Sequence, residues 1–118
     1  MHNYKDLKIW QKGREIVKDV YSLTSKLPAK EQFGLTFQLC RAAISIPSNI
    51  AEGAGRESEK EFAHFLAIAN GSAFEVETQL YLCFDLHYIS EVELNESLIK
   101  IQEIQRMIYR FKQQLKIS

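Results

Sequence analysis

Four segments of the chain place apolar side chains at steps of three and four residues, and this periodicity restricts the fold more than any other feature. Such spacing gathers the apolar side chains on one side of an α-helix. No segment shows the strict apolar and polar alternation that indicates a half-buried strand. Four amphipathic segments with short connections predict an all-α fold, an antiparallel up-and-down four-helix bundle with residues 1–118 as a single domain.

The first helix is expected from about Leu7 to Leu27. Asp6 is the expected N-cap, and Pro28 stops the helix because proline cannot continue it. Gly13 lies on the apolar stripe of this helix, where glycine is unfavourable by about 1 kcal/mol relative to alanine. We therefore expect another helix to approach closely at Gly13.

The second helix is expected to start near Glu31 and to run into the segment Ser45-Ile46-Pro47-Ser48-Asn49-Ile50-Ala51-Glu52-Gly53-Ala54-Gly55-Arg56. Pro47 removes one backbone hydrogen bond, so the helix either bends there or stops and restarts. Because the apolar arc keeps its phase beyond the proline, we expect a continuous helix kinked near Pro47. Residues 53–55 are expected to end it in a tight turn. The apolar arc is wide, which predicts contacts on two sides.

The third and fourth helices each begin with a Ser-x-x-Glu capping box, at Ser58 and at Ser90. The third should be the longest, continuing to about His87. Apolar residues recur through the fourth helix up to Leu115.

A narrow polar stripe follows the second helix, and it is the main candidate for a functional surface. Within about 100° of arc lie Gln38, Arg41, Ser45, Ser48, Asn49 and Glu52, with Arg56 following. The third helix offers polar partners at helical spacing, namely Ser72, Glu75 and Gln79, and Arg41 is placed to pair with Glu75. The stripe is either a structural polar network that fixes helix register or a binding surface, and the residues alone leave both open.

The formal net charge is zero, but the charges are unevenly distributed. Residues 1–30 carry seven basic and three acidic side chains, residues 31–99 carry three and eleven, and residues 100–118 carry five and one. The first and last helices of an up-and-down bundle are neighbours, so their positive charges can share one edge. Alternatively, they are solvated faces that only aid solubility.

Cys40 and Cys83 lie far apart on apolar stripes, without metal-ligand spacing, and are expected to be buried free thiols. The longest run without a charged residue, Phe62 to Phe74, is too short to span a bilayer. We expect a cytoplasmic protein with no membrane association.

Little in the sequence indicates chemistry. Glu61 and His64 have the Glu-x-x-His spacing of di-iron bundles, but the second such pair and the two further inward carboxylates are missing. The histidines lie at the N-terminus, near a helix start and near a helix end, without a nucleophile and carboxylate beside them. We therefore expect no enzymatic activity, no metal and no cofactor.

The sequence resembles the bacterial four helix bundle protein family, first recognised as proteins encoded by intervening sequences inserted in 23S ribosomal RNA genes. The match covers nearly the whole chain, the fourth helix by pattern alone. The matching elements are Asp6-Leu7-Lys8-Ile9-Trp10-Gln11-Lys12, Glu31, Phe33-Gly34-Leu35-Thr36, Arg41-Ala42-Ala43, residues 45–53, Gly55-Arg56, Glu61-Phe62, Phe65-Leu66, Ala69, Gly71-Ser72 and residues 75–80.

This resemblance implies a homopentameric ring of four-helix bundles with no known enzymatic activity. A relative with a similar fold, the accessory variability protein of diversity-generating retroelements, binds its reverse transcriptase and nucleic acid through a basic surface. The zero net charge of the present chain weakens the counterion-release contribution that dominates nucleic-acid affinity.

We accordingly expect a non-catalytic scaffold or adaptor that associates with copies of itself into a ring. A further protein is an additional expected partner. The alternative is an accessory protein that binds RNA or DNA through Lys8, Lys12, Arg106 and Arg110 on the basic first and last helices. A third and weaker alternative is a bundle metalloprotein.

Overall fold

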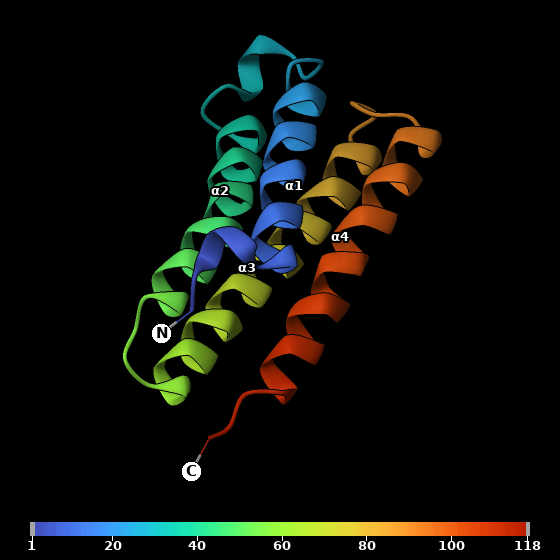
Figure 1. Ribbon diagram of the computed structural model, residues 1–118. Helices are drawn as coiled ribbons and strands as arrows, with labels where there is room; N and C mark the ends of the chain where they lie inside the picture. The colour runs from blue at the N-terminus through green and yellow to red at the C-terminus, as the bar shows by residue number, and fades with distance from the viewer. Residues whose placement is uncertain (1, 118) are drawn as a thin grey trace.

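The computed structural model describes residues 2–117, which form four α-helices and two short 3-10 helices (Figure 1). In chain order these are η1 (Tyr4–Asp6), α1 (Lys8–Thr24), η2 (Ala29–Glu31), α2 (Leu35–Ala54), α3 (Glu59–Asp85) and α4 (Glu91–Gln113). The helices alternate in direction along a body of 47 × 23 × 21 Å. No strand occurs in residues 2–117. The predicted all-α antiparallel four-helix bundle is therefore confirmed.

The four helices lie at the corners of a square. Each packs on its two neighbours in the order α1, α2, α3, α4 and back to α1, and in the described residues the backbones of the diagonal pairs α1–α3 and α2–α4 stay farther apart. The seam between α2 and α3 is the most extensive, and the seam between α1 and α4 is the least. Figure 1 shows the α4 ribbon standing apart from that of α1.

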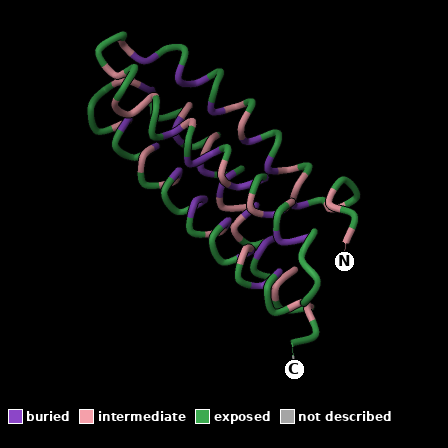
Figure 2. Tube along the Cα trace, turned by 90° about the vertical axis from the view of Figure 1, so that its left-hand side faces the viewer, coloured by how far each residue is buried: buried purple, intermediate pink, exposed green. Residues whose placement is uncertain are grey.

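The core is a single cluster of buried apolar side chains from all four helices, and Figure 2 shows these positions recurring along the helices. Small residues bring α2 and α3 together. Ala42, Ala43, Ala69 and Ala73 are fully buried. At Gly53, an added Cβ would lie 2.7 Å from Phe65 Cβ and 2.8 Å from a ring carbon of Phe62. Gly53 is therefore a close-packing position in the last turn of α2, and the helix ends at Ala54 with Gly55 as its C-cap, within the predicted residues 53–55.

The helix α2 continues through Pro47, as predicted, while the bend expected there stays a prediction. Pro47 is buried against Gly13 of α1, where an added Cβ would lie 3.2 Å from Pro47 Cβ. The predicted close approach at Gly13 is thus confirmed. α2 packs on α1 on one side and on α3 on the other, and both of these helices belong to the same chain. The contact beyond the chain's own bundle, for which we interpret the wide apolar arc of α2 as support, stays a prediction.

One predicted N-cap and one predicted helix start are wrong. Asp6 does not cap α1, because it lies inside η1 and the N-cap position is Leu7, which makes no side-chain cap. The second helix begins at Leu35 instead of Glu31, since residues 29–31 form η2 and the chain turns at Gly34. The Glu31 carboxylate instead accepts a hydrogen bond from the backbone N–H of Leu35, at 3.1 Å, and so caps α2 from outside the helix.

The starts of α3 and α4 follow the prediction. The hydroxyl of Ser58 accepts a hydrogen bond from the Glu61 N–H, and Ser90 and Glu93 form the full reciprocal box. α3 is the longest helix, with 27 residues. It ends in a Schellman motif at His87, which has a φ of 65°.

Candidate functional site

The polar stripe of α2 lies along the seam with α3, and its outer part is an ion pair. Arg41 donates to the Glu75 carboxylate at 2.9 Å and to the Gln38 side-chain oxygen at 3.2 Å. The predicted pair between Arg41 and Glu75 is confirmed. Both side chains are about half exposed, so the pair contributes at most about 1 kcal/mol.

In the inner part of the stripe, small polar side chains are linked by consecutive hydrogen bonds. The hydroxyl groups of Ser72 and Ser45 lie 2.8 Å apart, which joins α3 to α2. The Asn49 amide donates to the Ser45 hydroxyl and to the Ser45 carbonyl oxygen, both at 2.8 Å. Ser72 is buried, and the other two are half-buried. Buried polar groups paired in this way restrict how one helix can slide or rotate against the other.

The stripe continues to the end of α2. Arg56 donates to Glu52 at 3.1 Å, and its guanidinium carbon lies 4.8 Å from the centroid of the Phe65 ring. Gln79 is half-buried, and its side-chain oxygen is buried without a hydrogen-bond partner in residues 2–117. Most polar groups of the stripe therefore form hydrogen bonds or ion pairs with one another or with α3.

The four basic residues expected to bind nucleic acid do not form one free positive edge. Lys12 lies 3.1 Å from the carboxylate of Glu103 and 3.5 Å from that of Glu15. The Glu103 hydrogen bond raises the pKa of Lys12, against a smaller lowering by burial. Lys8 is exposed, as are Arg106 and Arg110. The predicted adjacency of the first and last helices is confirmed, but acidic side chains also line the seam.

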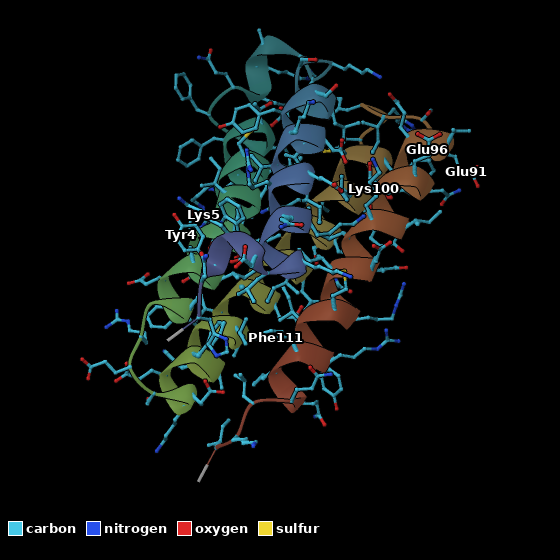
Figure 3. All side chains as sticks on the ribbon, viewed as in Figure 1. Tyr4, Lys5, Glu91, Glu96, Lys100 and Phe111 are labelled. Carbon is cyan, nitrogen blue, oxygen red and sulfur yellow. The ribbon has the colours of Figure 1, made fainter. Side chains whose placement is uncertain are left out.

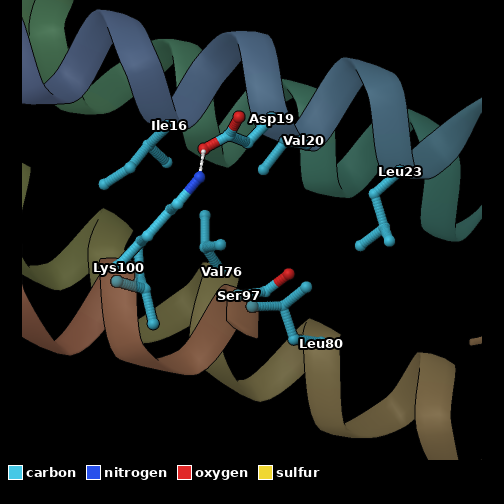
Figure 4. Close-up of a pocket in the computed structure, with 9 residues that line it drawn as sticks. Ile16, Asp19, Val20, Leu23, Val76, Leu80, Ser97 and Lys100 are labelled. Carbon is cyan, nitrogen blue, oxygen red and sulfur yellow. Dashed lines mark hydrogen bonds and ion pairs between the residues drawn. The ribbon is translucent and has the colours of Figure 1, made fainter. Parts of the chain in front are cut away.

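The thin seam between α1 and α4 is crossed by ion pairs. Besides Lys12 with Glu103, Lys100 of α4 pairs with Asp19 of α1 at 2.8 Å (Figure 4). Lys26, just after α1, pairs with Glu93 in the first turn of α4. This contact and the Ser90 N–H lower the pKa of Glu93 from 4.5 to about 2.

A small cavity lies beneath the pair formed by Lys100 and Asp19. Its volume is about 20 Å³, enough for about one water molecule. Ser97 is at its rim (Figure 4), and its walls are apolar, formed by Ile16, Val20, Leu23, Val76, Leu80 and Ile101. The helices α1 and α4 therefore meet through charged side chains over an incompletely filled core.

Glu31 ties three segments together at one end of the bundle. Its carboxylate accepts from the Leu35 N–H and, at 2.9 Å, from the hydroxyl of Tyr88, which follows α3. These two hydrogen bonds lower the pKa of Glu31, and the carboxylate raises the pKa of Tyr88. Sequence reasoning missed this role. The signal was an acidic residue four positions before a helix start, where an external cap can reach the first free N–H groups.

The first turn of α4 carries acidic residues and its last turn carries basic ones, which is the arrangement that the helix dipole favours. Figure 3 shows Glu91 and Glu96 near the start of the helix and Phe111 near its end. The last turn carries Arg110 and Lys112. Phe111 packs with His2 and Phe62, and the His2 ring lies 2.9 Å from the Glu59 carboxylate, which lowers the pKa of Glu59.

Glu61 and His64 are exposed, and within residues 2–117 no three His, Cys, Asp or Glu side chains are close enough to hold a metal ion. Cys40 and Cys83 are free; Cys83 is buried, as predicted, but Cys40 is only half-buried. Burial raises the pKa of Cys83 to about 11. A thiol with that pKa is a poor nucleophile.

In the described part of the chain, no helix has both the length and the hydropathy needed to cross a bilayer.

The sequence model of the 23S rRNA-intervening sequence proteins matches residues 5–110, from η1 to the last turns of α4. The chain belongs to this family. The match includes the α2 stripe, the Gly13 and Pro47 contact and the α1–α4 ion pairs. No curated protein sequence matches the chain.

A solved structure shares the fold. It is the crystal structure of a protein of unknown function from the S23 ribosomal protein family of Bacteroides thetaiotaomicron VPI-5482. The TM-score is 0.79, and the sequences are 23% identical over 88% of this chain and 97% of that one. At this identity the likeness concerns the fold alone. The 23S rRNA-intervening sequence family is thus established for the chain, and the family match and this neighbour assign it no activity.

Proposed function

We propose that this member of the 23S rRNA-intervening sequence family is a non-catalytic cytoplasmic scaffold that assembles into a homopentameric ring. One observation carries the proposal most directly, namely the large apolar side chains that the bundle leaves exposed on its helices. They include Phe37 and Ile44 on α2 and Phe74 and Tyr81 on α3. Exposed apolar surface of this kind marks contacts with other chains when it is gathered into patches.

Other features agree with a scaffold. The polar groups of the α2 stripe are mostly paired with one another, and the stripe thus fits a structural network that keeps the subunit rigid. Free, widely separated cysteines fit the reducing cytoplasm. The number five comes from the family resemblance, while the exposed apolar faces support assembly as such.

The test is size-exclusion chromatography coupled to light scattering, with absorbance at 260 and 280 nm recorded across the peak. A mass of five times the 13.7 kDa chain, with a protein-like absorbance ratio, is the expected result. A monomer at micromolar concentration would contradict the ring.

Nucleic-acid binding is a second proposal, supported by one feature of the structure. A shallow groove beside the start of α3 and the end of α4 is lined by three basic side chains, namely Arg56, Lys60 and Lys112, together with His64 and the acidic Glu61. Arg106 and Arg110 are exposed on α4 as well. Phosphate groups bind such surfaces through lysine and arginine.

Fluorescence polarisation with a short labelled single-stranded RNA at about 0.15 M salt tests this second proposal. Binding should weaken when Arg106 and Arg110 are both changed to Glu, while the chain mass in solution stays unchanged. The matched control is Lys30→Glu, at the opposite end of the bundle. Equal affinity of all three proteins would rule out a role for the end of α4.

A further inference from the structure

The bundle has two edges that differ in charge and lie on opposite sides. α1 and α2 form one edge of the square and α3 and α4 form the other, because only neighbouring helices have closely spaced backbones in the described residues. Both edges expose large apolar side chains at 42–60% of their surface, namely Tyr21, Phe37 and Ile44 on the first edge and Phe74, Tyr81 and Tyr109 on the second. Single exposed apolar residues are common on protein surfaces and do not indicate an interface. The apolar side chains on each edge instead group around one charged residue, and this grouping indicates a contact surface.

The α1–α2 edge is a shallow hollow with an unneutralised positive charge. Arg14, Val17, Ile44, Pro47 and Ser48 line it. The two other apolar side chains extend it at helical spacing, Tyr21 four residues beyond Val17 and Phe37 seven before Ile44. The Arg14 guanidinium lies 5.0 Å from the centroid of the Trp10 ring, and no carboxylate within residues 2–117 pairs with it.

The α3–α4 edge carries a negative charge held in a fixed position. The Glu77 carboxylate accepts from the side-chain amides of Gln102, at 3.1 Å, and Gln105, at 2.7 Å. No basic side chain of the described chain pairs with Glu77. Phe74 lies three residues before Glu77 and Tyr81 four after it, so both aromatics share its side of α3.

Tyr109 lies four residues after Gln105 and extends this edge onto α4. Two neutral amides orient the Glu77 carboxylate without cancelling its charge. The edge therefore presents a fixed anion surrounded by exposed aromatic rings, which complements a hollow that has apolar walls and one cation.

We propose that the α1–α2 edge of one copy docks on the α3–α4 edge of the next copy, with Arg14 beside Glu77, and that this contact closes the ring. The inference rests on the proposed assembly and names its interface. Because two different edges meet, the contact is heterologous, and such contacts form a ring when the rotation from copy to copy closes the circle. Opposite placement of the two edges leaves each copy free to contact one neighbour on each side.

Charge exchange tests the contact. The variants R14E and E77R each place like charges at the interface, and each should weaken assembly by about tenfold or more in dissociation constant. The double variant R14E/E77R restores an attractive pair at every heterologous contact and should recover the wild-type mass. Lys30→Glu, in η2, is the control and should assemble like the wild type. Sedimentation velocity over a concentration series gives the masses.

The outcomes separate the interface from the ring itself. A monomeric wild-type protein would overturn the ring and this inference together. Wild-type assembly that R14E and E77R both retain would overturn the interface and leave the ring standing. Weakened single variants without rescue in the double variant would also overturn the pairing. Far-UV circular dichroism and thermal unfolding of each variant show that lost mass is not lost folding.

Discussion

The seam between α2 and α3 and the seam between α1 and α4 are held together in different ways. Small residues let α2 and α3 approach closely, and the fully buried Ala42, Ala43, Ala69 and Ala73 lie on these two helices. α1 and α4 make fewer contacts, and ion pairs cross between them over a small apolar cavity.

Close packing thus dominates the α2–α3 seam, whereas the α1–α4 seam adds exposed ion pairs to a looser apolar contact. Close packing acts over short distances and is insensitive to salt, whereas exposed ion pairs are weak and screened. The α1–α4 seam should therefore open first in local unfolding, and it tolerates substitution better than the α2–α3 seam. Four predictions challenge or refine this contrast.

The largest effect is expected from Gly53→Val. Even one added carbon would lie 2.7 Å from Phe65 Cβ, which is close to the backbone of α3 and cannot swing aside. We expect a loss of about 3 kcal/mol in the free energy of unfolding, because overpacking separates the two helices. Urea denaturation measures it. A loss below about 0.5 kcal/mol would mean that α2 and α3 are not tightly packed there.

Gly71→Ala replaces a glycine of α3 and should have the opposite sign. An added Cβ at Gly71 has no atom within 4 Å, and the residue lies inside the helix. Alanine should therefore stabilise the protein by about 1 kcal/mol through helix propensity. Thermal unfolding of both glycine variants compares them directly. Destabilisation by this substitution would contradict the open environment at Gly71.

The ion pairs should contribute less. A double-mutant cycle with Asp19→Ala and Lys100→Ala should give a coupling of about 0.5 kcal/mol that fades in about 1 M salt. The same cycle on Arg41 and Glu75 is the comparison across the packed seam. If the α1–α4 seam depends on charge, high salt should increase amide exchange in α4 more than in α3. Equal exchange in the two helices would contradict the contrast.

The smallest effect is expected in the pH dependence of stability. The pKa of Glu93 is about 2 in the folded chain against an ordinary 4.5. Because the folded value is the lower one, its stabilising contribution is complete above pH 4.5 and is lost as the pH falls towards 2. Glu93→Gln should therefore reduce stability at neutral pH and leave it nearly unchanged near pH 2. A constant difference at all pH values would contradict this assignment.

Much of the bundle could be predicted from periodicity and capping alone. The Ser58 and Ser90 caps fixed two helix starts, and helical spacing placed Arg41 opposite Glu75. Errors occurred where a distant side chain decides the local structure. Glu31 caps Leu35 from outside the helix, and this displaces the start of α2 by four residues from the predicted position.

The candidate surfaces were harder to predict than the fold. Lys12 was expected to contribute positive charge, but Glu103 lies beside it because α1 and α4 meet in one particular rotation. Helical periodicity defines which side of each helix is apolar, while the side chains that meet across a seam depend on rotation and register. The roles proposed for Arg14 and Glu77 depend on how the four helices are placed around the square, which periodicity alone does not give.

Glycine and proline are both unfavourable inside helices, yet the contact between Gly13 and Pro47 fixes the position of α1 along α2. Glycine provides the only notch on α1 at that level, and the proline ring fills it from α2. Sliding α1 by one turn would bring Ile9 or Val17 against the proline, where no notch exists. Substitutions at positions 13 and 47 should therefore covary among related sequences.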